Sequence, residues 1–237
     1  MKKFTFSLLL FFVGLSAGVA QKLELHYDYL SPRKYFTSTV TDFIVDKLGN
    51  TFYFIDFNYD NNEQGHSMSL AYFEIHREFA LTKKGYDGIK FHVEYNDGFL
   101  ISSSADQEIG ANLGFPLNRV WVLGFGYPIK IGKNLTLDSY IGYRASSDSD
   151  NKDAMVSTAW FNTLFNNKLI FTGFIDVWSR HFEAEDKRKL VFLSEPQLWY
   201  QISPKFAVGG EVELSYNFTG EKGFKAYPTV GLRYVLK

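Results

Sequence analysis

Apolar and polar residues alternate with a period of two along most of the chain from Lys34 onward. In residues 51–59, for example, Tyr53, Ile55 and Phe57 fall on one face while Asp56 and Asn58 fall on the other. Gly, Asn, Asp, Ser or charged clusters break the pattern roughly every ten to fifteen residues. Such alternation is typical of β-strands with one apolar and one polar face. The pattern predicts an all-β protein.

The alternation marks about twelve candidate strands, and one further segment, residues 23–30, alternates as well. Single-chain bacterial outer-membrane barrels have an even number of strands. We therefore predict a barrel of about twelve strands, with residues 23–30 as an extra segment at its periplasmic mouth or plugging it. The twelve candidates begin near Tyr35, Thr51, Ser67, Gly88, Ala105, Arg119, Asn134, Ala154, Lys168, Leu190, Phe206 and Phe224.

The connections in the C-terminal half alternate between short turns and longer polar loops. Short periplasmic turns and longer external loops are typical of transmembrane barrels. This asymmetry predicts an antiparallel up-and-down transmembrane β-barrel whose C-terminus lies in the periplasm. The short turns are Gly132-Lys133, Asn166-Asn167 and residues 203–205, and the longer loops are residues 146–153, 181–189 and 218–223.

The first twenty residues have the pattern of a secretory signal peptide. Lys2 and Lys3 precede a largely apolar run over residues 4–13, and the small residues Gly18 and Ala20 flank Val19 at the expected cleavage site. We predict that residues 1–20 are the signal peptide and residues 21–237 a single barrel domain. No later segment approaches the roughly 18 consecutive apolar residues of a membrane-spanning helix.

Composition narrows the location and the chemistry further. The chain has no cysteine, which excludes disulfides, thiolate metal sites, a cysteine nucleophile and a lipoprotein anchor. Its net charge of −1 gives no general attraction to nucleic acid, so no nucleic-acid partner is expected. Aromatic residues make up 18% of a chain whose mean hydropathy is −0.15, a combination typical of outer-membrane barrels. We therefore expect a location in the bacterial outer membrane, with its lipid as a partner.

A soluble or secreted β-sandwich remains the alternative fold, because it also shows regular alternating strands. The two folds differ in which face of the sheet meets water. In a sandwich the charged face would be solvated, whereas in a membrane barrel it would line the lumen. The aromatic load of the apolar faces favours the barrel.

The faces predicted to point inward carry carboxylates and basic side chains. Carboxylates accept hydrogen bonds from hydroxyl or amine donors, and aromatic rings offer stacking surfaces. We therefore place a solute-binding constriction among Glu74, Glu94, Asp176, Glu195 and Glu211, with Tyr72 and Trp178 as stacking surfaces. The alternative is that the charges only hydrate the interior or pair with one another. Further inward aromatics are predicted at Tyr140, Trp160, Phe174 and Trp199.

Two local features stand apart from the regular pattern. Pro196, in Glu195-Pro196-Gln197, cannot donate to a strand ladder and predicts a bulge or bend there. His76 shares a strand face with Glu74 and Glu78, which could form a metal or acid–base site, although a lone histidine there is more often a plain lumen residue. Neither an HExxH nor a GxSxG motif is present, so we expect no enzyme, no catalytic residue, no metal site and no cofactor.

Several runs of the sequence resemble a bacterial outer-membrane barrel family related to Tsx-like nucleoside-specific channels. They are SLAYFEIHREF (69–79), HVEYNDG (92–98), FTGFIDVWSR (171–180), FLSEPQLWY (192–200) and GGEVELSYNF (209–218). The resemblance spans nearly the whole mature chain and implies a twelve-stranded barrel and, by looser analogy, a narrow pore for nucleosides. Many such barrels end on an aromatic residue, whereas this chain ends Tyr234-Val235-Leu236-Lys237.

The sequence thus predicts a porin-like channel for small polar solutes, with nucleosides as one candidate. A structural or surface-interaction barrel without transport is the alternative, and an outer-membrane enzyme is the third hypothesis.

Overall fold

The computed structural model describes residues 21–30, 33–59, 61–62, 65–66, 68–103, 112–132, 135–147, 153–182, 186–218 and 222–236. The predicted signal peptide lies outside these residues. The elements in chain order are β1 (Lys22–Asp28), β2 (Phe36–Asp46), β3 (Gly49–Tyr59), β4 (Asn61–Asn62), β5 (Gly65–His66), β6 (Leu70–Ala80), the 3₁₀ turn η1 (Gly85–Asp87), β7 (Lys90–Ser103), β8 (Asn112–Pro116), β9 (Val120–Ile131), β10 (Leu135–Ser146), β11 (Asp153–Leu164), β12 (Leu169–Phe182), β13 (Lys187–Ser194), β14 (Gln197–Ser203), β15 (Phe206–Tyr216) and β16 (Phe224–Val235). Within the described segments, no helix has the length and hydrophobicity that a membrane span requires.

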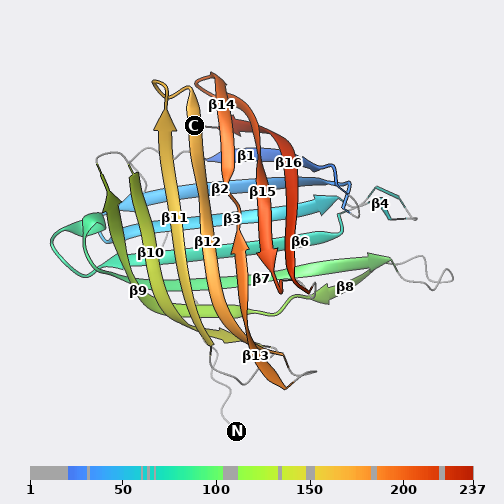
Figure 1. Ribbon diagram of the computed structural model, residues 1–237, viewed down its shortest axis with the longest axis horizontal. Helices are drawn as coiled ribbons and strands as arrows, with labels where there is room; N and C mark the ends of the chain where they lie inside the picture. Colours follow the sequence, from blue (N-terminus) through green and yellow to red (C-terminus); the bar gives the residue numbers. More distant parts are fainter. Residues whose placement is uncertain are drawn as a thin grey trace, which may run out of the picture.

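All strands except β4 and β5, which pair only with each other, form one antiparallel sheet. This sheet closes on itself, because β1 pairs with both β2 and β16 (Figure 1). Strands β8 and β9 both pair with β7 and together make one strand of the wall, and β13 and β14 do the same beside β12. Counted in this way the wall has twelve strands, each next to its neighbour in sequence. The predicted antiparallel twelve-stranded barrel is confirmed, and a β-sandwich is excluded.

Two strand assignments made from the sequence are wrong. Residues 23–30 were expected outside the wall, but Glu24 in β1 pairs with Thr39 on one side and with Arg233 on the other. The candidate near Ala105 is not a separate wall strand, because β8 only lengthens the hairpin with β7; residues 104–111 lie outside the described residues. The rule of an even strand number gives the total number of wall strands, but it does not decide which of the alternating segments belong to the wall.

The outward face is apolar and the inward face is polar. In β9, Val120 and Val122 are buried, whereas Trp121, Leu123 and Phe125 are 45–57% exposed on the outside. The opposite holds for charged residues: several inward side chains are 4% exposed or less, namely Glu24, His26, Lys90, His92, Glu94 and Arg233. An apolar exterior around a polar interior is the distribution that a lipid-embedded barrel requires.

The two ends of the barrel differ in the length of their connections. Residues 47–48, 132–134, 165–168 and 204–205 are the short links at one end. The first and last described residues also meet there, since the Leu236 amide donates to the Gln21 carbonyl at 2.9 Å. Longer links, including residues 60–69, 104–111 and 217–223, join the strands at the other end. The short-turn end is the one predicted to face the periplasm.

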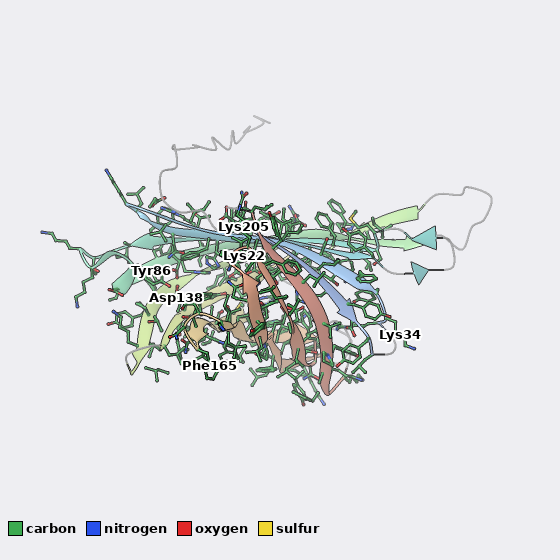
Figure 2. All side chains as sticks on the ribbon, turned by 90° about the horizontal axis from the view of Figure 1, so that it is seen from above. Lys22, Lys34, Tyr86, Asp138, Phe165 and Lys205 are labelled. Atoms are coloured by element: carbon green, nitrogen blue, oxygen red, sulfur yellow. The ribbon has the colours of Figure 1, made fainter. Side chains whose placement is uncertain are left out.

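One link at the short-turn end is longer and folds toward the lumen. Residues 81–89 contain η1, and the Tyr86 hydroxyl donates to Asp138 Oδ2 of β10 at 2.8 Å. Figure 2 shows Tyr86 and Asp138 close together on one side of the barrel. The ammonium of Lys90 lies 4.4 Å from the centre of the Tyr86 ring and also pairs with Asp138. This link therefore covers part of the lumen mouth.

The wall strand made of β13 and β14 is interrupted at Glu195 and Pro196. Pairing with β12 has the same register on both sides of the gap, because Asp176 faces Leu193 and Thr172 faces Gln197. No residue is inserted at Pro196, so the expected bulge is absent there. The strand pairing is interrupted instead, without a change of register. Proline lacks the N–H that the ladder would use.

The neighbouring pair β15 and β16 has a gap at a matching height. Its pairing stops after Gly209 and Gly231 and resumes at Val212 and Pro228. The Thr229 hydroxyl bridges the gap, since it accepts a hydrogen bond from the Glu211 amide at 3.2 Å. An open pocket of about 360 Å³ lies over both gaps and is lined by Phe171, Pro196, Gln197, Leu198, Gly209, Gly210, Glu211, Val212 and Thr229.

Candidate functional site in the polar lumen

The inward side chains gather into three groups. The Trp199 cluster comprises Glu24, His26, Gln197, Trp199, Glu211, Thr229 and Arg233 on β1, β14, β15 and β16. The His92 cluster comprises Asn50, His76, Glu78, Lys90, His92, Glu94, Asn96 and Tyr140 on β3, β6, β7 and β10. The central carboxylates are Asp56, Glu74, Asp176 and Glu195.

The Trp199 cluster is built around a buried ion pair. The Arg233 Nε donates to Glu24 Oε1 at 2.8 Å, and its guanidinium lies 4.2 Å from the centre of the Trp199 ring. A second guanidinium nitrogen donates to Gln197 Oε1 at 2.7 Å, and Trp199 Nε1 donates to the same oxygen at 3.1 Å. Trp199 is fully buried, so a large aromatic ring fills this part of the lumen.

His26 occupies the middle of the Trp199 cluster and has a partner at each ring nitrogen. Its Nε2 lies 3.2 Å from Glu24 Oε2, and its Nδ1 lies 2.9 Å from the Thr229 hydroxyl. The edge of the ring meets Trp199 at a centroid distance of 5.4 Å. His26 is therefore held by complete hydrogen bonding within the wall.

The His92 cluster lies on another part of the wall and also places a histidine between carboxylates. His92 Nε2 lies 3.2 Å from Glu94 Oε2, and its Nδ1 lies 3.7 Å from Glu78 Oε1 without a hydrogen-bond partner. The ring stacks on Tyr140 at a centroid distance of 3.7 Å, and the Tyr140 hydroxyl donates to Glu94 Oε2 at 2.6 Å. These contacts fix the plane of the imidazole.

Glu78 is itself held by two donors. The Asn50 amide donates to Glu78 Oε2 at 2.8 Å, and the Lys90 ammonium forms an ion pair with the same oxygen. Lys90 is fully buried and also reaches Asp138. Since a buried ammonium is costly unless paired, the two carboxylates account for its place in the wall.

His76 completes the His92 cluster from β6. It lies directly opposite Glu94 in the β6–β7 register, and its ring is 5.1 Å from that of His92. One potential ligand atom from each of His76, His92 and Glu94 lies within 4.8 Å of the other two. The β6–β7 register thus brings together three metal-ligating side chains whose proximity the sequence does not show.

The central carboxylates come from strands on opposite sides of the barrel. Glu74 of β6 interacts electrostatically with Asp176 of β12, and Glu195 interacts in the same way with Asp56 of β3. All four are partly accessible to water although the wall surrounds them. Among the described residues, none of the four has a basic side chain within ion-pair distance. Carboxyl groups without a basic partner among the described residues therefore gather in the middle of the lumen.

The seven residues predicted to form one constriction are divided among these groups. Glu74, Asp176 and Glu195 are central carboxylates, Glu94 belongs to the His92 cluster, and Glu211 belongs to the Trp199 cluster; the last two also interact electrostatically with the centre. Tyr72 lies beside Glu74, to which its hydroxyl donates at 3.1 Å.

Trp178 is placed differently from the other six. It packs in an apolar cluster of the lumen with Val120, Val122, Met155 and Val191, and its ring meets Phe218 at 5.9 Å. That cluster lies toward the end with the longer loops, so Trp178 fills space there even though Asp176 is only two residues away.

Of the other aromatics predicted to face inward, Tyr140 and Trp199 are buried in the two clusters, and Phe174 is paired with Ala159 on the inner face. Trp160 is on the outer face, opposite Gly173 and in contact with Phe171 at 5.5 Å. The prediction for Trp160 is wrong, because the mixed residues of β11 give a poor indication of which face is polar.

The sequence prediction left out several lumen residues. Glu24 and His26 were missed because β1 was placed outside the wall. His92 falls on the polar face of a predicted strand, and its signal was the alternation alone. Its position next to His76 depends on the register between β6 and β7, which no local pattern contains.

Among solved structures, the barrel is similar to the COG4313 outer membrane channel from Pseudomonas putida F1, with a TM-score of 0.51, 10% identity, and coverage of 94% of this chain and 96% of that chain. It also matches LpxR from Salmonella typhimurium, with a TM-score of 0.48, 11% identity and coverage of 91% and 99%. A third match is the KdgM porin in complex with disordered oligogalacturonate, with a TM-score of 0.43, 9% identity and coverage of 92% and 99%.

Identities at this level indicate a shared fold, and the first match carries that conclusion. The chain has the barrel fold of bacterial outer-membrane proteins. No match was found among the curated proteins. The family described as "Domain of unknown function (DUF5020)" matches residues 20–236, nearly the whole chain, and the chain belongs to that family.

Proposed function

We propose that this protein is an outer-membrane channel that binds and passes small polar solutes, and that it is not an enzyme. The observation that carries the proposal is the convergence of Asp56, Glu74, Asp176 and Glu195 from opposite walls. A lumen with uncompensated carboxylates attracts cations and offers acceptors to hydroxyl and amino donors. Lumen charges of this kind set the selectivity of channels.

Nucleosides are the finer form of the proposal. A nucleoside combines hydroxyl donors with a flat base, and Tyr72 presents an aromatic ring beside the acceptor Glu74. The ring of Phe54 lies 5.7 Å from that of Tyr72 and extends the aromatic surface. Stacking on such surfaces tolerates different bases. The resemblance to nucleoside-specific channels noted in the sequence points to the same solutes.

A structural or surface-interaction barrel is the second candidate, and one contact favours it. The Lys22 ammonium of β1 reaches across the barrel to the Phe161 ring of β11 at 5.8 Å. Together with the fully buried Trp199, this contact narrows the interior at the short-turn end. A barrel closed in this way would act through its loops.

Conductance of the mature protein in planar lipid bilayers distinguishes the two candidates. We expect single-channel openings and, across a KCl gradient, a reversal potential that indicates cation selectivity. The double variant Glu74→Gln, Asp176→Asn removes two central charges while keeping similar shapes, so its permeability ratio should move toward equal passage of K⁺ and Cl⁻. Asp46→Asn, at the β2–β3 turn, is the matched control and should leave the ratio unchanged.

Solute identity is then tested by uptake into liposomes with a panel of nucleosides, sugars and amino acids. Saturable nucleoside uptake that the double variant weakens would support the finer proposal. Folded protein, verified by heat-modifiable migration on gels, that gives no conductance and no uptake would exclude the channel and favour the second candidate.

A further inference from the structure

We propose that His76, His92 and Glu94 form a binding site for a divalent transition-metal ion such as Zn²⁺ on the inner wall of the barrel. The inference does not depend on the proposed channel function, because a metal site in the wall is compatible with an open or a closed lumen. It rests on the ligand set, on the surrounding hydrogen bonds and on one buried nitrogen without a partner.

The donor set suits the metal. Two imidazole nitrogens and one carboxylate are a recurrent Zn²⁺ ligand set, and three protein ligands leave at least one coordination position for water or a solute. At metal–ligand distances of about 2.0–2.2 Å, tetrahedral neighbours lie roughly 3.4 Å apart. His92 Nε2 and Glu94 Oε2 are 3.2 Å apart, and one ligand atom from each of His76, His92 and Glu94 lies within 4.8 Å of the other two. Small side-chain movements would bring the three ligand atoms to these distances.

The strand register makes the site rigid. His76 and Glu94 are cross-strand partners of the antiparallel pair β6–β7, and His92 is two residues from Glu94 on the same face. All three ligands therefore come from two hydrogen-bonded strands and not from loops. A site on such elements is held more precisely than one on mobile segments.

The groups behind the ligands are those expected around a metal site. A metal-bound histidine usually donates its other N–H to a carboxylate, which fixes the ring and its tautomer. His92 Nδ1 faces Glu78 Oε1 at 3.7 Å and is a buried nitrogen without a hydrogen-bond partner. Glu78 is anchored by Lys90 and Asn50, so it is held next to that nitrogen.

Glu94 is oriented in the same way. Its Oε2 accepts from the Tyr140 hydroxyl at 2.6 Å, and its Oε1 accepts from the Asn96 amide at 3.1 Å. A metal ion at His92 Nε2 needs the lone pair of that nitrogen, so the bound neutral imidazole would carry its single proton on Nδ1, facing Glu78; a second proton, if the ring starts as imidazolium, is released to water. Proton release on metal binding is the general consequence of using neutral imidazole ligands.

The test is isothermal titration of ZnSO₄ into the detergent-solubilised mature barrel. We expect one Zn²⁺ per barrel for the wild-type protein. His92→Asn and His76→Asn each remove a ligand and should weaken binding more than Glu78→Gln, which removes only a supporting carboxylate and should cost about 10–100-fold. His26→Asn, in the Trp199 cluster, is the matched control and should bind Zn²⁺ as the wild type does.

Two further measurements guard against misfolding and adventitious binding. Heat-modifiable migration must show that each variant is a folded barrel. Co²⁺ in place of Zn²⁺ should give the visible absorption of a four- or five-coordinate ion in wild type and His26→Asn but not in His76→Asn. The proposal is overturned if folded wild-type protein binds no Zn²⁺, or if the folded double variant His76→Asn, His92→Asn binds it with unchanged affinity.

Discussion

The Trp199 cluster and the His92 cluster are two solutions to the same problem, a buried histidine between carboxylates on the wall of one barrel. In the first, His26 has a partner at both ring nitrogens, and Arg233 neutralises Glu24. In the second, His92 leaves Nδ1 without a partner, and His76 stands beside it.

The difference shows that burial and charge alone do not indicate a ligand site. In the Trp199 cluster both ring nitrogens of His26 have partners, and the buried nitrogen without a partner belongs to the Arg233 guanidinium, which has no lone pair to offer a metal ion. The His92 cluster also holds a histidine between carboxylates, but His92 Nδ1 has no partner and a second imidazole, that of His76, lies beside it. The feature that separates the two clusters is a histidine nitrogen without a partner that lies beside a second imidazole.

The largest expected effect comes from breaking the Trp199 cluster with Arg233→Met. Glu24 would then be a buried carboxylate without its cation, which typically costs about 3–5 kcal/mol of unfolding free energy. Urea unfolding of the barrel in detergent or lipid measures the loss. Arg77→Met is the control, because its ion pair with the half-exposed Asp46 at the β2–β3 turn should contribute no more than about 1 kcal/mol. Equal losses in both variants would show that the cluster does not brace the wall.

The next effect distinguishes the two histidines through metal linkage. At free Zn²⁺ about a hundredfold above its Kd, binding to the folded state alone adds about 2.7 kcal/mol to the unfolding free energy. We expect that gain in wild type and in His26→Asn, and none in His92→Asn. The measurement is the shift of the urea midpoint with and without ZnSO₄. If the gain were lost in His26→Asn and kept in His92→Asn, the metal would bind in the Trp199 cluster and the comparison between the clusters would be reversed.

The smallest effect concerns one hydroxyl of the His92 cluster. Tyr140→Phe keeps the stack on His92 but removes the donor to Glu94, so we expect a loss of about 1.5 kcal/mol for a hydrogen bond to a charged group. Tyr143→Phe, on the outer face of the same strand and 45% exposed, should change stability by less than about 0.5 kcal/mol. Indistinguishable unfolding curves for the two variants would mean that Tyr140 acts through its ring alone.

Much of the fold follows from period-two patterning, because one wet face and one lipid face impose it on every strand. The inward positions of Glu74, Glu94, Asp176 and Glu211 were predictable for that reason. The assignment of wall strands and inward faces is wrong where segments outside the wall also alternate, or where the alternation is weak. β1 alternates as well as any other strand, but the requirement for an even strand number places it outside the wall. β11 has too few charged residues to show on which face of the sheet Trp160 lies.

The grouping of the lumen side chains was not predictable in the same way. Alternation decides whether a side chain points inward, but its height and neighbours depend on the stagger between strands. His76 meets Glu94 only because residues 81–89 set the β6–β7 register, and Glu195 reaches Asp56 only because the sheet closes.

Closure of the sheet also sets an order on folding. Neighbouring wall strands are consecutive in the sequence everywhere except at the pair β1–β16. This pair joins residues as far apart as Glu24 and Arg233, which are 209 positions apart along the chain. Until β16 is in place, β1 is an open edge with unpaired backbone groups, and Glu24 lacks its cation. Contacts at such separation are the slowest to form because the intervening chain must first be ordered. Pairing of β16 with β1 therefore both closes the barrel and brings Arg233 to Glu24. A folding intermediate that has not closed has an edge strand open to aggregation and an unpaired carboxylate on its inner wall.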